Sequence, residues 1–166
     1  MTNKRLPPAH VIDVQLHDPR WKKSLKSYRK DVQHACMAVL ASATRCEVTI
    51  VLADDALVKE LNATYRGQNK PTNVLSFPAC ENTAARNTRR STTYGYLGDV
   101  VLAYETVRKE AAEQEKTFGD HAVHLLVHGV LHLMGYDHQD DISARKMETL
   151  EIKILKKLGV SNPYLS

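Results

Sequence analysis

Two spacings of apolar residues alternate along the first half of the chain and predict strands and helices in turn. Residues 12–16 alternate apolar and polar side chains, as a half-buried strand does. After Asp18-Pro19, apolar residues recur at helical spacing from Trp21 to Val39, which predicts one long core helix with proline at its first position. The β-branched run over residues 47–53 then predicts a buried strand.

The next segments continue this order. Asp54-Asp55 predicts the start of a helix that Gly67 ends. Residues 73–77 and 98–103 read as short strands, and the charged, alanine-rich residues 105–116 as a helix. Between these strands, eighteen residues after Pro78 are almost free of aliphatic side chains, and a polar stretch of this length is usually functional or disordered.

The most apolar helix is predicted to begin at Asp120. Its side chains are apolar on nearly every side through Leu133, so we expect it to be buried and its histidines to line the floor of a cleft. Asp141 is expected to cap a last helix that ends at Gly159. Four short strands and about five helices predict an α+β fold: one domain over residues 1–166, with a small mixed four-stranded sheet and a central buried helix.

The composition supports the prediction of one domain and indicates where in the cell the protein is located. A chain of 166 residues, 43% of them hydrophobic, is long enough for one core and short for two. No run approaches the roughly 18 apolar residues of a membrane span, and residues 1–17 lack a signal-peptide core, so we expect a cytoplasmic protein with no membrane partner. Cys36, Cys46 and Cys80 are odd in number and widely spaced, which indicates small buried side chains rather than disulfides.

Three histidines near the end of the central helix have the spacing of a metal site. His128 and His132 are four residues apart and project from one helix face, and Gly135 stands where the chain can turn and direct His138 back. Imidazole is a usual zinc ligand, and three protein ligands leave a fourth position open, as in catalytic sites. We expect one Zn²⁺ per chain, although nickel and copper accept nitrogen ligands too. The plain alternative is three ordinary surface histidines.

The same spacing occurs in the metzincin protease signature, H-E-x-x-H-x-x-G-x-x-H. Where those proteases carry the glutamate that acts as general base, this chain has Gly129. The metal ligands are kept, and the base for peptide hydrolysis is absent.

The excess of basic residues is localised. Between Leu61 and Gly98 there are five basic residues and one acid, Glu81, whereas the remainder of the chain is balanced. Such an excess is expected for a partner that carries phosphate, although basic surface loops also occur for solubility. The five are Arg66, Lys70, Arg86, Arg89 and Arg90.

Residues 128–138, together with Tyr65-Arg66 and the run Pro71-Thr-Asn-Val-Leu-Ser-Phe-Pro78, resemble the YbeY family of metal-dependent bacterial endoribonucleases. The resemblance runs from about Leu61 to the final helix. It implies an α+β fold, zinc bound by the three histidines, Arg66 needed for action on RNA, and a role in ribosomal RNA maturation and ribosome quality control. Asn69 and Asn73 stand where the family pattern usually has aspartate, so each position keeps its shape and loses a negative charge.

The function predicted from these features is a single-strand-directed, zinc-dependent endoribonuclease acting on ribosomal RNA of the small subunit. Arg66 would hold the scissile phosphate through its planar fork, although a helix-terminal arginine also contacts its own last carbonyls. The catalytic residues predicted are Arg66, His128, His132 and His138, and the substrate-binding residues are Arg66, Lys70, Arg86, Arg89, Arg90 and His124.

His124 lies one turn before His128. It is a candidate to face a phosphate or to contact one of the metal-binding side chains, and the alternative is an ordinary helix residue. No general base is evident. Asp137 is a candidate to orient His138 or another metal ligand, and Asp99 is a candidate to reach the cleft; both equally fit turn and strand-end roles. Two rival functions remain: a peptide hydrolase of metzincin type, and a non-catalytic RNA-binding ribosome assembly factor stabilised by zinc.

Overall fold

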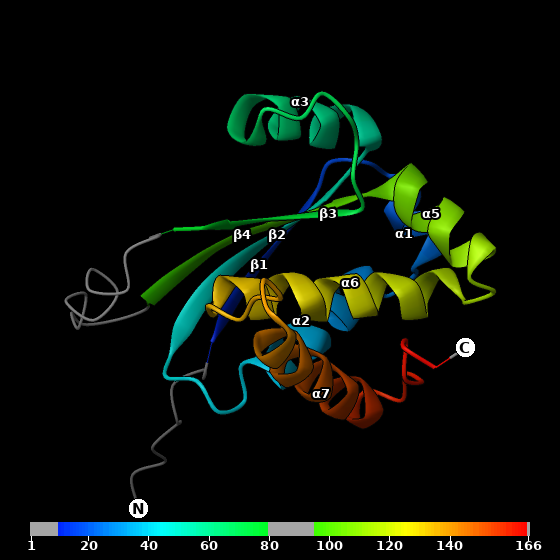
Figure 1. The fold of residues 1–166 in the computed structure, drawn as a ribbon. Helices are drawn as coiled ribbons and strands as arrows, with labels where there is room; N and C mark the ends of the chain where they lie inside the picture. Colours follow the sequence, from blue (N-terminus) through cyan, green and yellow to red (C-terminus); the bar gives the residue numbers. More distant parts are fainter. Residues whose placement is uncertain (1–9, 80–94, 166) are drawn as a thin grey trace, which may run out of the picture.

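A four-stranded mixed sheet lies at the centre of the protein (Figure 1). The computed structural model describes residues 10–79 and 95–165. Strands β1 (Val11–Leu16), β2 (Cys46–Ala53) and β4 (Gly95–Ala103) are parallel, and β3 (Val74–Pro78) pairs antiparallel with β4. The strand order is β1-β2-β4-β3, which confirms the predicted mixed sheet.

Six helices in the described residues cover the sheet in layers. Helices α2 (Tyr28–Val39) and α6 (Phe118–Leu133) lie on one face, and α7 (Asp141–Lys157) packs on their outer side (Figure 1). Helix α3 (Asp55–Arg66) covers the opposite face. The short α1 (Arg20–Ser24) and α5 (Tyr104–Glu113) lie at the end of the sheet where the parallel strands finish. The predicted α+β fold is confirmed.

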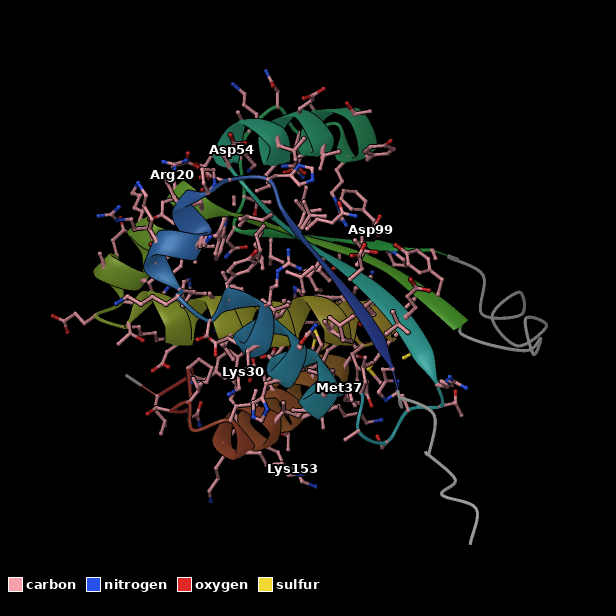
Figure 2. The ribbon with its side chains drawn as sticks, turned by 180° about the vertical axis from the view of Figure 1, so that it is seen from behind. Arg20, Lys30, Met37, Asp54, Asp99 and Lys153 are labelled. Carbon is pink, nitrogen blue, oxygen red and sulfur yellow. The ribbon has the colours of Figure 1, made fainter. Side chains whose placement is uncertain are left out.

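Helix α6 is the buried central element that the sequence predicts. It packs on β3 and β4 and is flanked by α2, α5 and α7. It begins at Phe118, two residues before the predicted start, because the Thr117 side chain caps it by accepting the backbone N–H of Asp120 at 3.1 Å. Four of its apolar side chains are fully buried: Val127, Val130, Leu131 and Leu133. The outer surface of this side is formed by α2, with Lys30 and Met37, and by α7, with Lys153 (Figure 2).

The predicted single helix from residue 19 to residue 39 is wrong in one respect: the chain breaks into α1 and α2. Leu25 is extended, with φ −126° and ψ 93°, directly after α1. The break allows Trp21 to bury fully and to donate its indole N–H to the carbonyl of Ala53 at 2.8 Å. Apolar spacing continues across the break, so periodicity alone does not reveal it.

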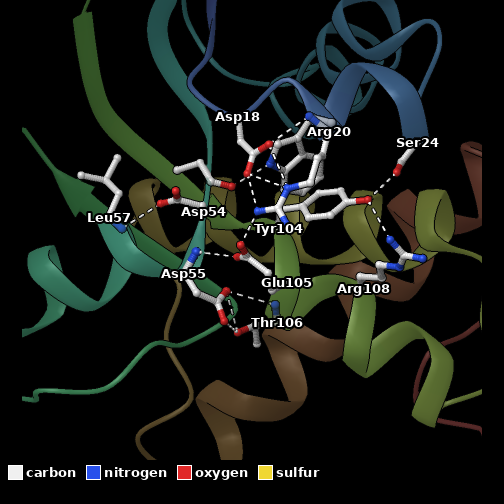
Figure 3. A network of polar contacts seen from close by, with 12 residues as sticks. Asp18, Arg20, Ser24, Asp54, Asp55, Leu57, Tyr104, Glu105, Thr106 and Arg108 are labelled. Atoms are coloured by element: carbon white, nitrogen blue, oxygen red, sulfur yellow. Dashed lines mark hydrogen bonds and ion pairs between the residues drawn. The ribbon is translucent and has the colours of Figure 1, made fainter.

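A polar network joins the elements at the carboxyl ends of the parallel strands (Figure 3). Arg20 bonds to the carboxylates of Asp18 and Glu105. Glu105 accepts the backbone N–H of Asp55 at 2.7 Å, and Asp55 in turn accepts the backbone N–H of Thr106 at 3.0 Å. The N-termini of α3 and α5 therefore cap each other, which fixes α3 over the sheet.

Cys36 and Cys46 are buried and free, as predicted, and Cys80 lies outside the described residues. Burial raises the pKa of the Cys46 thiol to about 11. Within residues 10–79 and 95–165, no helix has the length and apolar character that a bilayer span requires.

Candidate metal centre and cleft

Three histidine side chains converge on one point of the structure. The Nε2 atoms of His128 and His132 lie 3.0 Å apart. The centre of the His138 ring lies 5.6 Å from that of His128 and 5.1 Å from that of His132. One ligand atom from each side chain lies within 4.8 Å of the others, so this cluster could hold a metal ion.

The end of α6 explains why the third histidine joins the first two, which lie one helical turn apart. Gly135 follows the helix with a φ of 100°, a left-handed conformation that favours glycine. Its N–H donates to the carbonyl of His132 at 3.0 Å, and the N–H of Tyr136 donates to the carbonyl of Leu131 at 3.1 Å. This Schellman motif reverses the chain and brings His138 back. The predicted turn at Gly135 is confirmed.

The imidazole nitrogens suit a transition metal. Burial, followed by the neighbouring His128 and His138, lowers the pKa of His132 to about 4. Its ring is therefore neutral at pH 7 and offers a lone pair. Nitrogen donor sets of this kind suit zinc, copper and nickel, so the residues present fit a divalent transition metal.

The histidines lie in a cleft of about 980 Å³. Its walls are the end of α3 with the loop that follows it, strand β3, and residues 135–139. Arg66, Lys70 and Tyr136 are among the exposed side chains of these walls. Cationic, aromatic and metal-binding side chains therefore share one open cleft.

Arg66 is the last residue of α3, and it reaches across to β3. Its Nη2 donates to the carbonyl of Ser76 at 2.9 Å, and its guanidinium carbon lies 5.8 Å from the centre of the Phe77 ring. A guanidinium has five N–H donors, so this contact positions the group and leaves donors for an anion. The bond to Ser76 distinguishes Arg66 from a helix-terminal arginine that contacts only its own helix.

The other predicted substrate-binding residues are placed differently. Lys70 lines the cleft. His124 does not line it, because it lies one turn further back along α6, where its Nε2 is 3.7 Å from a carboxylate oxygen of Glu151. Three predicted residues lie outside the described part of the chain: Arg86, Arg89 and Arg90.

The two candidate acids also differ. Asp137 lines the cleft, and its carboxylate accepts a backbone N–H from its own turn. Asp99 lies on the other face of the sheet, toward α3, and accepts the hydroxyl of Tyr96 (Figure 2). Side chains alternate along a strand, and the next residue, Val100, faces α6. Asp99 therefore points away from the cleft.

Gly129 lies where α6 approaches the sheet most closely. The Ser76 hydroxyl donates to its carbonyl at 2.9 Å. A Cβ at this position would lie 2.7 Å from Val100 Cγ1 and 3.2 Å from Ser76 Oγ. The position at which metzincins carry their glutamate therefore has no room for a side chain in this fold.

Most of the chain is similar in sequence to one family of known proteins. The family model described as Endoribonuclease YbeY matches residues 13–159. The chain belongs to the YbeY family. Endoribonuclease YbeY of Parvibaculum lavamentivorans is 50% identical over 156 residues, which span 92% of this chain and 84% of that protein. Endoribonuclease YbeY of Sinorhizobium medicae is 46% identical over 160 residues, which span 92% of each.

A solved structure shares the fold of this YbeY family member. The solution structure of TM1509 from Thermotoga maritima has a TM-score of 0.55, with 94% of this chain and 100% of that chain covered at 24% identity. This likeness concerns the fold alone, and it agrees with the layered α/β arrangement described above.

Asn73, which stands where the YbeY pattern usually has aspartate, has a hydrogen-bond partner in this chain. The amide of Asn73 donates to both carboxylate oxygens of Glu110 on α5, at 3.2 and 3.0 Å. Glu110 also bonds to Nε2 of the buried His121 at 2.8 Å. An aspartate at position 73 would place two like charges together, so the amide fits this chain's own network. Asn69 is exposed and does not line the cleft.

Glu151 on α7 contacts the histidine cluster, and the sequence analysis did not identify it. It is fully buried, and it accepts hydrogen bonds from Nδ1 of His128 and from the Tyr164 hydroxyl. Burial alone raises the pKa of Glu151, but nearby His124 and the bonds from His128 and Tyr164 outweigh it and lower the pKa to about 2. Nε2 of His124 lies 3.7 Å from the nearer carboxylate oxygen of Glu151, which is longer than a direct hydrogen bond.

A sequence signal for Glu151 exists. The apolar face of α7 includes Met147 and Ile154, and position 151 lies between them on the same face. An acid on the buried face of a helix requires a partner, so this pattern predicts a polar contact, although it does not identify His128.

Proposed function

We propose that the protein is a zinc-dependent endoribonuclease that cuts single-stranded RNA. The observation that carries this proposal is the shared cleft, where the histidine cluster and the Arg66 guanidinium line the same space. Membership of a family whose curated members are named endoribonucleases supports the reaction class.

Zinc is the ion we propose, held by His128, His132 and His138. When bound, it supplies Lewis acidity toward a phosphoryl oxygen. The neutral ring of His132 is ready to bind without losing a proton, because its pKa is lowered to about 4. These three residues are therefore catalytic as metal ligands.

Arg66 and Lys70 are proposed to hold the RNA phosphates. Arg66 keeps its orientation through Ser76 and presents its remaining donors as a planar fork that matches a phosphate. Lys70 adds a positive charge on the same wall. Arg86, Arg89 and Arg90 are proposed to extend this basic surface along the RNA backbone.

An exposed aromatic side chain in the cleft supports single-stranded RNA as the substrate. Tyr136 lines the cleft with 37% of its surface exposed, and an exposed aromatic ring stacks on an unpaired base. We further propose that the cellular substrate is ribosomal RNA of the small subunit, in cytoplasmic maturation and quality control of ribosomes. The family resemblance supports this narrower assignment.

Two single-residue variants test the proposal with labelled single-stranded RNA and a duplex of the same sequence. Wild type loaded with zinc should cut the single strand in preference to the duplex. Arg66→Lys should cut about 100-fold more slowly with wild-type metal content, because an ammonium cannot reproduce the bidentate fork. His132→Ala should lose both metal and cleavage.

Arg145→Lys is the matched control, because Arg145 is exposed on α7 and does not line the cleft. It should cut RNA as wild type does. A fully active Arg66→Lys variant would contradict the role of Arg66. Cleavage that persists in His132→Ala would show that the nuclease activity comes from a contaminant.

The peptide-hydrolase alternative lacks support at Gly129, where no acid can act as base. Metal-loaded protein is expected to leave unstructured peptides intact. The alternative of a non-catalytic, zinc-stabilised RNA-binding factor predicts RNA binding without cleavage in the same assay.

A further inference from the structure

A buried carboxylate connects α7 and the segment after it to the histidine cluster. Glu151 is 0% exposed. One of its oxygens accepts the Nδ1–H of His128, and the other accepts the hydroxyl of Tyr164. Glu151 and Tyr164 do not line the cleft, so neither is placed to touch RNA there.

The bond from His128 to Glu151 determines which ring nitrogen is free. A carboxylate accepts a hydrogen bond from a nitrogen that carries a proton, so Nδ1 of His128 carries the hydrogen and Nε2 keeps its lone pair. That Nε2 is the atom 3.0 Å from Nε2 of His132. Glu151 therefore holds His128 in the tautomer and orientation that a metal ligand needs.

Glu151 has no lysine or arginine beside it among the described residues. Its ion-pair contacts within this part of the chain are with His124 and His128. A buried carboxylate without a cation is costly. A divalent ion on the far side of the His128 ring would balance this charge through the imidazole.

Tyr164 completes the arrangement from the segment after α7, which turns back toward α6 (Figure 1). Its ring lies edge-on to His124, with 5.9 Å between ring centres. Residue 164 lies beyond residue 159, where the match to the family model ends.

We propose that Glu151 and Tyr164 are positioning residues of the metal centre: Glu151 orients His128, and Tyr164 holds Glu151 in place. This inference rests on the proposal that the three histidines bind a metal. It extends that proposal, because affinity for a divalent cation then depends on residues that lie outside the cleft.

The test measures zinc affinity by competition with a chromophoric chelator and the visible absorption of the cobalt-substituted protein. Glu151→Gln should weaken zinc binding about 10- to 100-fold and change the cobalt spectrum, because the orienting carboxylate is lost. Tyr164→Phe, which removes one hydroxyl, should weaken binding by a smaller factor in the same direction. Glu148→Gln is the matched control: it removes the same charge from an exposed position on α7 and should bind like wild type.

Each outcome is informative. Wild-type zinc affinity in a folded Glu151→Gln variant would overturn the role of Glu151, and wild-type affinity in Tyr164→Phe would overturn that of Tyr164. If Glu151→Gln does not fold, the zinc affinity and cobalt spectrum of Tyr164→Phe test the proposal, and values equal to wild type would overturn it. Wild type that binds no metal would overturn the proposed metal centre and this inference together. Metal binding that depends on Glu151 without RNA cleavage would overturn the proposed function alone.

Discussion

Gly129 allows α6 to lie directly against the sheet. Val100 and Ser76 occupy the space that a side chain there would need. Restoring the protease glutamate at this position would therefore push the helix away from the sheet before it could supply a base. The sequence shows only that glycine stands where the protease signature has glutamate, and the packing shows why a side chain does not fit there.

Gly129→Ala should destabilise the protein. Overpacking a core typically costs about 1–3 kcal/mol, and the higher helix propensity of alanine offsets roughly 1 kcal/mol of this. Urea denaturation should show a net loss of unfolding free energy. Gly129→Ala should cost less unfolding free energy when it is added to a Val100→Ala variant than when it is added to wild type. The Val100→Ala change removes the atoms that the new methyl group would meet.

Gly95→Ala serves as the control, because a Cβ there meets nothing within 4 Å. An unchanged or increased stability of Gly129→Ala would show that α6 can move away from the sheet at little cost.

The separation of residues in the sequence explains which site residues could be predicted. His128, His132 and His138 lie within one short motif, so local helix geometry was enough to bring them together. Glu151 lies 23 residues beyond His128, and its contact depends on how α7 crosses α6. Local rules carry no information on that crossing.

Among the secondary-structure elements, most helices and all four strands are predicted by the spacing of apolar residues and by the residues that begin or end a helix. Asp54 caps α3 by accepting the N–H of Leu57, and Gly67 ends that helix, as predicted. The break between α1 and α2 could not be predicted, because Trp21 binds the carbonyl of Ala53, a residue that is distant in the sequence. The prediction of one long helix failed because a tertiary contact determines where the chain breaks.

Removing the proposed zinc ion should leave the fold in place. Helix α6 is held by apolar packing on the sheet and on three other helices, so the ion is not needed to form it. After treatment with a chelator, the far-ultraviolet circular dichroism should be unchanged and cleavage of RNA should be lost. The melting temperature should fall, because a ligand that binds only the folded state stabilises it.

Unfolding on removal of the metal would instead support a structural zinc site. His132→Ala, measured without metal, shows how much of any change comes from the histidine cluster itself.

At the scale of the whole molecule, metal-free protein should lose stability as the pH falls. His132 has a folded pKa of about 4, below the usual value of 6.5, because it is buried beside other imidazoles. The unfolded chain therefore binds a proton between pH 6.5 and 4 while the folded chain does not, and its stability decreases across this window.

Glu151 acts in the same direction at lower pH. Its folded pKa of about 2 lies below the usual 4.5, so its contribution is present above pH 4.5 and is lost as the pH falls toward 2. Urea denaturation at pH 7, 5.5 and 4.5 should show the decline, and His132→Asn should reduce its slope in the upper part of this range. A flat profile in wild type would contradict the lowered pKa of His132.

The strand order has a consequence for how the protein is made. Strand β3 pairs only with β4 among the described strands, and β4 lies between β2 and β3. Residues 74–78 leave the ribosome well before residues 95–103, so β3 must wait with both edges unpaired until β4 is inserted. Unpaired strand edges are sites of aggregation. The wall of the cleft that carries the Arg66 contact is thus completed only after β4 has been made, and a chain that stops before β4 lacks this wall.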